Sequence, residues 1–250
     1  MFDPPISSPG DESADGVGAL AARALALVAK RAAQARRDDL SETAVTELLA
    51  AALGRSDESY RHAVSRMRAR GIGADGIVGG YVPEVATRLG ELWCEDEASF
   101  AEVTLAMSRM QSLVRELAEG WHARVGAAAP SVLVVLPEDT DHTLGALVIS
   151  SLLRHRGVAA HLLIAPEPDE VAGAVASDGH RGVMISAARS DAIDKVRQLV
   201  HCAQTARPSD PAPVILGGSI ADDEKGSRIG ADLVTSDLDE ALRFCGIEAR

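Results

Sequence analysis

A histidine and a glycine follow a short apolar run in the second half of the chain. The run at 132–136 leads into a polar stretch and then into His142, with Gly145 three residues further on. This arrangement is typical of a turn from a strand into a helix. A neutral imidazole in such a turn can ligate a metal ion, and a nearby glycine lets a bulky group approach the backbone. We therefore take His142 as the candidate metal ligand.

Two further loops of small residues follow later apolar runs. Ser186 and Ala187 end one run, and Gly217, Gly218 and Ser219 end another. Two adjacent glycines remove the side chains that would block close approach to the backbone. If these runs are parallel strands, both loops lie at the same edge of the sheet as the histidine loop, and the three loops together border a slot lined with small residues.

The position of these loops depends on an alternation of strands and helices in the second half of the chain. Short apolar runs predict five strands, at 132–136, 159–163, 182–186, 214–216 and 233–235. Helical segments are expected between and after them, near 143–155, 168–177, 191–206, 219–228 and 237–244. This alternation predicts a Rossmann-like (flavodoxin-like), doubly wound α/β fold with a five-stranded parallel sheet, whose ligand lies beyond the carboxyl ends of the strands.

The first half of the chain has helical periodicity only. Apolar residues at intervals of three and four predict helices at about 17–37, 43–53, 58–70, 82–93 and 99–121. We interpret Gly79 and Gly80 as breakers before the fourth helix, and Ser99 with Glu102 as the capping box of the fifth. The first half is therefore expected to be a helical bundle.

These patterns divide the chain into three parts. Residues 1–15 combine proline, glycine, serine and aspartate and are expected to form a disordered tail. Residues 16–125 form the helical bundle, and residues 131–250 form the α/β domain. The small-residue stretch at 126–130 joins the two.

Composition and charge exclude several classes of protein. The 250 residues are 46% hydrophobic, so the chain can bury a sizeable core, and the formal net charge of -12 disfavours direct binding to DNA. No apolar run approaches the roughly 20 residues of a membrane span, so we expect a cytoplasmic protein. The three cysteines form no C-x-x-C pair, which argues against a zinc site or a disulfide framework.

The histidine loop and the two small-residue loops together carry a family resemblance. His142-x-x-Gly145, then Ser186, then Gly217-Gly218 resembles the D-x-H-x-x-G, S-x-L and G-G pattern of cobalamin-binding domains. The resemblance implies that His142 is the lower axial ligand of cobalt and that the helical bundle is a cap over the corrin. The cofactor-binding residues that it implies are Trp93, His142, Thr143, Gly145, Ser186, Ala187, Gly217, Gly218 and Ser219.

Residues of the helical half resemble one family of cobalamin-binding proteins in particular. Leu89-Gly-Glu-Leu-Trp93 looks like the cap motif that places a tryptophan over the corrin, and the passages 89–111 and 142–157 look most like the AerR/PpaA photosynthesis antirepressors. The resemblance implies a cobalamin-binding, light-responsive transcription regulator without catalytic activity. Its partner would be a CrtJ/PpsR-like transcriptional repressor, and it would contact neither DNA nor a membrane.

The chain departs from the family pattern at several positions. Thr140 and Ala188 stand where the family usually has an acidic residue and a leucine. In regulators that use adenosylcobalamin the cap carries a Glu-His pair, and the corresponding residues here are Val103 and Thr104. The cap therefore has no upper histidine at that position, which favours hydroxo- or aquocobalamin over adenosylcobalamin.

Two other functions fit the same residues. A corrinoid carrier of a methyltransferase system shares the two-part layout. A haem-binding sensor on the same fold would use His142 as its iron ligand, since haem and corrinoid each need one imidazole and a large apolar pocket.

Overall fold

The computed structural model describes residues 40–54, 56–137, 143–177, 179–187, 193–207, 209–222 and 225–248. The expected tail at 1–15 and the expected helix at 17–37 lie outside these residues. So do His142, Thr140 and Ala188.

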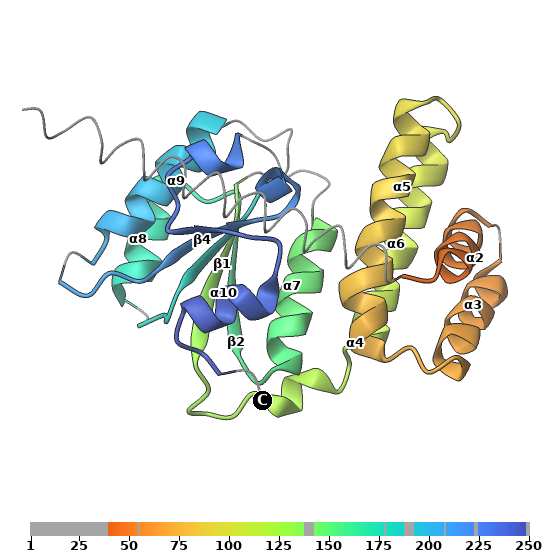
Figure 1. Cartoon of the computed structure of the whole chain (residues 1–250), viewed down its shortest axis with the longest axis horizontal. Coiled ribbons are helices and arrows are strands. Elements are labelled where there is room, and N and C mark those ends of the chain that lie inside the picture. Colours follow the sequence, from red (N-terminus) through yellow and green to blue (C-terminus); the bar gives the residue numbers. More distant parts are fainter. Residues whose placement is uncertain are drawn as a thin grey trace, which may run out of the picture.

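Four long helices form the described part of the N-terminal region (Figure 1): α2 (Glu42–Leu53), α3 (Asp57–Ala69), α5 (Val82–Cys94) and α6 (Phe100–Leu117). They share one apolar core, whose largest fully buried side chains are Leu48, Met67, Ile77, Leu89, Met110 and Leu113. The predicted capping box of α6 is confirmed, because Ser99 Oγ accepts from the Glu102 N–H and the Glu102 carboxylate accepts from the Ser99 N–H.

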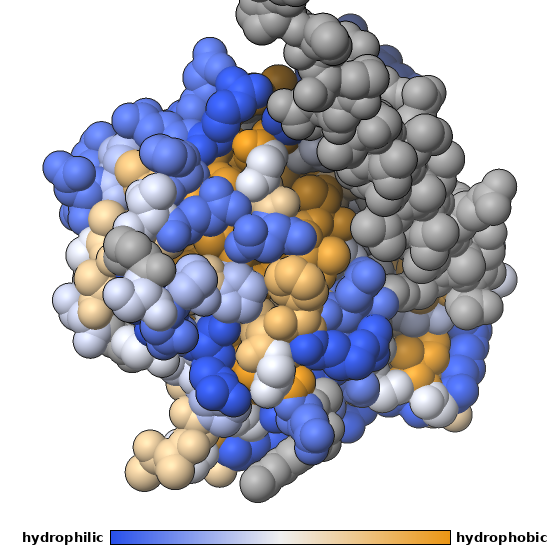
Figure 2. Space-filling model, turned by 60° about the vertical axis from the view of Figure 1, so that its left-hand side comes forward, coloured by the Kyte–Doolittle hydropathy of each residue, from blue (hydrophilic) through white to orange (hydrophobic). Residues whose placement is uncertain are grey.

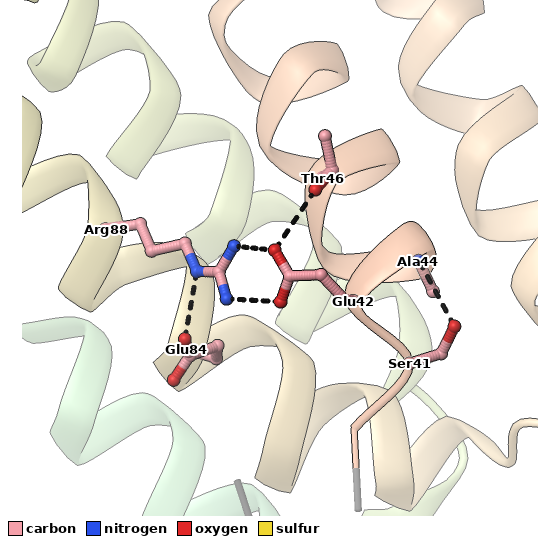
Figure 3. Close-up of polar contacts among 6 residues, drawn as sticks. All are labelled: Ser41, Glu42, Ala44, Thr46, Glu84 and Arg88. Atoms are coloured by element: carbon pink, nitrogen blue, oxygen red, sulfur yellow. Dashed lines mark hydrogen bonds and ion pairs between the residues drawn. The ribbon is translucent and has the colours of Figure 1, made fainter. Parts of the chain in front are cut away.

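A polar network joins α2 to α5 (Figure 3). Arg88 donates to both carboxylate oxygens of Glu42, over 2.6 and 2.7 Å, and its Nε donates to Glu84 one turn earlier on α5. Ser41 caps α2, since its side chain accepts from the backbone N–H of Ala44.

The interpretation of Gly79 and Gly80 as helix breakers is wrong. The short helix α4 (Ala74–Gly76) runs through the π-helical turn η1 (Ile77–Tyr81) directly into α5. The glycines serve close packing instead. A Cβ on Gly79 would lie 3.2 Å from the Leu152 side chain, and a Cβ on Gly80 would lie 3.1 Å from that of Leu40.

The second half of the chain forms a parallel sheet, as predicted. Its strands are β1 (Ser131–Leu136), β2 (Ala159–Ile164), β3 (Val183–Ser186), β4 (Val214–Gly217) and β5 (Leu233–Val234). The order is β2-β1-β3-β4-β5, and every pair of neighbours is parallel. This is the flavodoxin-like order, so the predicted fold class is confirmed.

Helices cover both faces of the sheet (Figure 1). They are α7 (Thr143–His155), α8 (Pro168–Ser177), α9 (Ile193–Thr205) and α10 (Leu238–Phe244). Leu133 and Val135 of β1 pack into the cluster that contains α8 and α9, whereas Val132 and Val134 pack with α7 and α10. The period-2 alternation of β1 thus divides its side chains between two cores.

Two expected helices have different limits. The segment at 219–228 contains two 3-10 turns, η3 (Ser219–Asp222) and η4 (Gly226–Arg228), instead of one helix. The chain folds back between them so closely that a Cβ on Gly226 would lie 2.4 Å from the Ile220 carbonyl oxygen. In the first half, α6 ends at Leu117, and Trp121 begins a separate turn, η2 (Trp121–Arg124).

Helix α7 belongs to both halves of the molecule. Its residues Leu144 and Val148 are buried in the core of the helical region, while Ala146 and Leu153 are buried against the sheet. Packing on α7 therefore fixes how the helical region sits beside the α/β region.

Hydrophilic and hydrophobic residues are both exposed on one face of the molecule (Figure 2). Figure 2 shows one side of the molecule, on which hydrophilic residues border a smaller area of hydrophobic ones. None of the described helices combines the length and apolar composition needed to cross a membrane.

Candidate functional site

The carboxyl ends of the strands define where the sequence-predicted site must lie. Because all neighbours are parallel, the loops after β1, β3, β4 and β5 leave the sheet at one edge. Strand order reverses direction between β1 and β3, which makes this the topological switch point. The loop that contains His142 follows β1 there, although the residue itself lies outside the described part of the chain.

The loops after β3 and β4 pack directly against each other. The Ala187 N–H donates to the Gly217 carbonyl over 3.1 Å, and the Ile220 N–H donates to the Ala187 carbonyl over 3.3 Å. Gly218 has φ +84, and a Cβ there would lie 2.3 Å from the Ala187 carbonyl oxygen. Only glycine fits this position, because a side chain would be strained and would collide with the backbone.

The start of α7 lies close to the end of β3. A Cβ on Gly145 would lie 4.0 Å from Ser186 Oγ, with no nearer atom around it. Gly145 is itself exposed. The glycine thus leaves the Ser186 hydroxyl accessible from the side of α7, which is where a ligand at the switch point would pass.

Two other predicted residues border this edge. Thr143 is exposed at the start of α7, and its hydroxyl accepts a hydrogen bond from the Gln111 amide of α6 over 2.9 Å. Ser219 is exposed and begins η3 beside Gly218. The structure therefore brings the described loop residues to one edge, with α6 attached to it through Thr143.

Sequence reasoning missed Thr235, which follows β5 at the same edge. Its carbonyl lies 3.3 Å from the Cβ position of Gly217. Its buried hydroxyl donates to the Glu240 carboxylate and accepts from the Asp237 N–H. The signal that could have identified it is a hydroxyl residue at the end of the last strand, followed by Asp237 as the N-cap of α10.

Above this edge, helices α5 and α6 extend past the start of α7 (Figure 1). The Gln111–Thr143 bond marks where α7 begins, and the eleven residues of α6 before Gln111 extend about 16 Å beyond that level. Phe100 and Gln111 are eleven residues apart, so they lie on the same face of α6. Phe100 is therefore on the face that meets α7 and is 69% exposed.

Trp93 occupies the matching end of α5. Ala86, Gly90 and Trp93 lie at i, i+4 and i+7, so two small residues and an indole share one face. A Cβ on Gly90 would have no heavy atom within 4 Å, and Trp93 is 52% exposed. Trp93 thus lies on an open surface. Gly90 and Phe100 were not predicted as site residues from the sequence. Their exposure depends on where α7 begins relative to α5 and α6, which is a tertiary feature.

The described residues contain no group of three metal-ligating side chains. The sequence-predicted donor is the single imidazole of His142, which suits a metal that arrives inside a macrocycle, as iron does in haem. A cleft of about 550 Å³ lies elsewhere, at the carboxyl end of α7, where Asp75, His155, Arg156 and Asp239 line it.

The overall fold is similar to that of a solved corrinoid protein. The monomethylamine corrinoid protein of Methanosarcina barkeri has a TM-score of 0.63 at 17% identity, over 82% of this chain and 98% of that chain. A cobalamin-binding protein from Desulfitobacterium hafniense DCB-2 has a TM-score of 0.43 at 16% identity, over 81% of this chain and 97% of that one. The first likeness shows that this chain, with its helical region followed by a Rossmann-like α/β region, shares its fold with that protein.

Sequence comparison gives the family. No protein-family model matches the chain. A relative from Rhodobacter capsulatus, the uncharacterized 20.5 kDa protein in the bchF-crtJ intergenic region, is 35% identical over 162 residues, which are 63% of this chain and 84% of the relative. The chain belongs to the family of this Rhodobacter capsulatus protein.

Proposed function

We propose that the chain binds cobalamin between the carboxyl edge of its sheet and the overhanging ends of α5 and α6. The observation that carries this proposal is the space beside Ser186 at the switch point, where a Cβ on Gly145 would still lie 4.0 Å from Ser186 Oγ. Gly90 leaves space on α5 as well, since no heavy atom lies within 4 Å of its Cβ position. A fold shared with a corrinoid protein supports the choice of ligand.

In this proposal the residues have distinct roles. His142 would hold the cobalt through its imidazole, and Trp93 would contact the corrin. The nucleotide tail is bordered by Thr143, Gly145, Ser186, Ala187, Gly217, Gly218 and Ser219. Bound cobalamin would supply a visible-light chromophore whose upper ligand can be exchanged. Hydroxo- or aquocobalamin is the form we propose, since Val103 and Thr104 offer no imidazole to the upper face.

The proposed output is regulation through a protein partner rather than catalysis. The chain is acidic, with a net charge of -12, so contact with a DNA-binding partner is physically more favourable than contact with DNA. By its name, the Rhodobacter capsulatus relative lies beside crtJ. We therefore propose a light-responsive antirepressor that acts on a CrtJ/PpsR-like repressor.

Cobalamin retention tests the first part of the proposal. The full chain is mixed with hydroxocobalamin, desalted, and examined by visible absorption in dark and light. We expect wild type to retain corrinoid, His142→Ala to lose or shift its bands, and His62→Ala, an exposed histidine on α3, to behave as wild type. If the chain retains only haem in a parallel titration, its cofactor is haem and not cobalamin. If it retains neither haem nor cobalamin, the proposal is overturned.

Repressor affinity tests the second part. The affinity of the cobalamin-loaded chain for a CrtJ/PpsR-like repressor is measured in dark and light. A ligand shifts a two-state protein only by its differential affinity for the two states, so the affinities must differ if cobalamin controls the output. Equal affinities in dark and light would contradict a light-responsive regulator while leaving cobalamin binding intact.

A corrinoid carrier is the second candidate, and the fold match to the monomethylamine corrinoid protein favours it. Transfer of a methyl group from methylcobalamin on this chain to an acceptor, with a methyltransferase present, would support it. Unchanged methylcobalamin in the same mixture would favour the regulator.

A further inference from the structure

The turn between α5 and α6 carries large apolar side chains that the fold does not bury. We call residues 90–108 the distal corner. Trp93, Phe100 and Leu105 are each more than half exposed there. Leu105 is about 120° around α6 from Gln111, so it lies away from the face that meets α7. The apolar surface thus extends beyond the proposed corrin contact.

The charge of the distal corner is strongly one-sided. Five acidic residues occur between Arg88 and Arg109 and no basic residue does: Glu91, Glu95, Asp96, Glu97 and Glu102. All five are exposed. Within the part of the chain that the structure describes, Glu91, Glu95, Asp96 and Glu97 form no ion pair. The corner therefore combines exposed apolar groups with an uncompensated negative field.

The distal corner is also held in shape. The N–H groups of Glu97 and Ala98 both donate to the Leu92 carbonyl, over 2.9 and 3.1 Å, and close the end of α5. Ala98 is buried, and the capping box fixes the start of α6. A preorganised surface loses little freedom when another segment binds to it.

A segment of the same chain has the complementary chemistry. Residues 17–37 contain five basic residues and no acidic one, among alanine, leucine and valine. Arg23, Lys30 and Arg37 recur every seven residues, so in the helix predicted there they would form one row beside an apolar face. The segment therefore matches the corner in both charge and apolar character.

The connection to α2 lets this segment reach the corner. Leu40 lies against Gly80, immediately before α5. Gly80 and Trp93 are thirteen residues apart along the helical stack, which is about 20 Å, whereas a helix of 21 residues would be about 30 Å long. The segment is long enough to run along α5 to its end.

We propose that residues 17–37 dock on the distal corner and cover Trp93, Phe100 and Leu105 in the ligand-free protein. This goes beyond the proposed function and does not depend on cobalamin binding.

The test measures access to the corner in the full chain without cobalamin. Trp93 access is followed by acrylamide quenching, with the buried Trp121 as the background. Cys94 access is followed by its rate of reaction with a maleimide, and the half-buried Cys202 and the buried Cys245 give the background. We expect the triple Glu variant, Arg23→Glu with Lys30→Glu and Arg37→Glu, to raise the quenching of Trp93 and the reaction rate of Cys94 by at least about twofold each. The reason is that like charges then face each other. The control is Arg61→Glu with Arg68→Glu and Arg228→Glu, on exposed positions elsewhere.

Charge reversal on the corner completes the test. Glu91→Lys, Glu95→Lys and Glu97→Lys, added to the triple Glu variant, should restore the protection of Trp93 and Cys94. Equal access in wild type and the triple Glu variant would overturn the proposal. Protection that rises with protein concentration would overturn it as well, because a second copy of the chain would then be the cover.

Discussion

The two halves of the α5–α6 pair differ in what they contact. In the proximal half, η1 packs on α7 so closely that Gly79 meets Leu152, and Leu89 and Met110 are fully buried. In the distal half, the same two helices expose Trp93 and Phe100. The proximal half is built for packing, whereas the distal half keeps large apolar groups that the fold itself does not need. This difference in burial indicates that the distal half is the surface of the α5–α6 pair that can bind a ligand or partner.

Truncation of one residue in each half should show the largest contrast. We expect Leu89→Ala to lower the free energy of unfolding by about 2–5 kcal/mol, because it leaves a cavity in a closed core. Trp93→Ala should change it by less than about 1 kcal/mol, since the indole is half exposed. Urea denaturation of both variants checks this, and a large loss for Trp93→Ala would show that the distal half is part of the fold.

The α/β half offers a similar contrast between two glycines with positive φ. Gly218→Ala should destabilise by about 2–4 kcal/mol, because left-handed strain adds to a collision with Ala187. Gly230→Ala should cost only about 1–2 kcal/mol, since φ is +94 but nothing lies within 4 Å. Thermal unfolding measures the stability lost in each variant. Equal losses in Gly218→Ala and Gly230→Ala would mean that the close approach of Gly218 to Ala187 adds nothing to the cost.

These contrasts also show which features could be predicted from the sequence. The strands and the capping box were predicted correctly because their signals are local: apolar runs for β1 and β4, and a serine three residues before a glutamate for α6. The clustering of Ser186, Gly217 and Gly218 followed from the rule that parallel strands end at one edge.

The remaining features depend on contacts between distant parts of the chain. Gly79 and Gly80 were misinterpreted as breakers because only the approach of Leu152 and Leu40 shows that they are packing positions. The segment at 219–228 has helical composition, but the approach of Gly226 to Ile220 breaks it into two turns. No local pattern contains this information.

Adding a methyl group to one glycine in each half sharpens the first comparison. Gly90→Ala should raise the free energy of unfolding by about 0.5–1 kcal/mol, because alanine favours a helix and the space is open. Gly79→Ala should lack this gain, since its Cβ would lie 3.2 Å from Leu152. Chemical denaturation measures both, and an equal gain would mean that the proximal half tolerates expansion.

A larger side chain at Gly90 separates stability from ligand binding. Gly90→Leu should leave the fold intact but reduce retention of hydroxocobalamin after desalting, because the side chain fills space that the proposal gives to the corrin. Gly173→Leu, on α8 with nothing within 4 Å of its Cβ position, is the matched control. Undiminished retention in Gly90→Leu would place the ligand away from α5.

The smallest expected effect lies in the ion pairs that hold α2 against α5 (Figure 3). The hydrogen bonds from Arg88 lower the pKa of Glu42 from its ordinary value of 4.5. A carboxylate with a lowered pKa stabilises the fold above its ordinary pKa, and this stabilisation is lost as the pH falls through the lowered value. Wild type should therefore lose stability below about pH 5.

Substitution of Arg88 isolates this contribution. Because the Glu42 carboxylate is largely exposed, Arg88→Met should reduce stability at pH 7 only slightly and flatten the decline at acid pH. Arg61→Met, on an exposed position of α3, should leave the decline unchanged. Urea denaturation at a series of pH values makes the comparison. An equally steep decline in Arg88→Met would assign the acid sensitivity to other carboxylates, of which Glu47 is the first to examine because Arg66 and Arg70 lower its pKa in the same way.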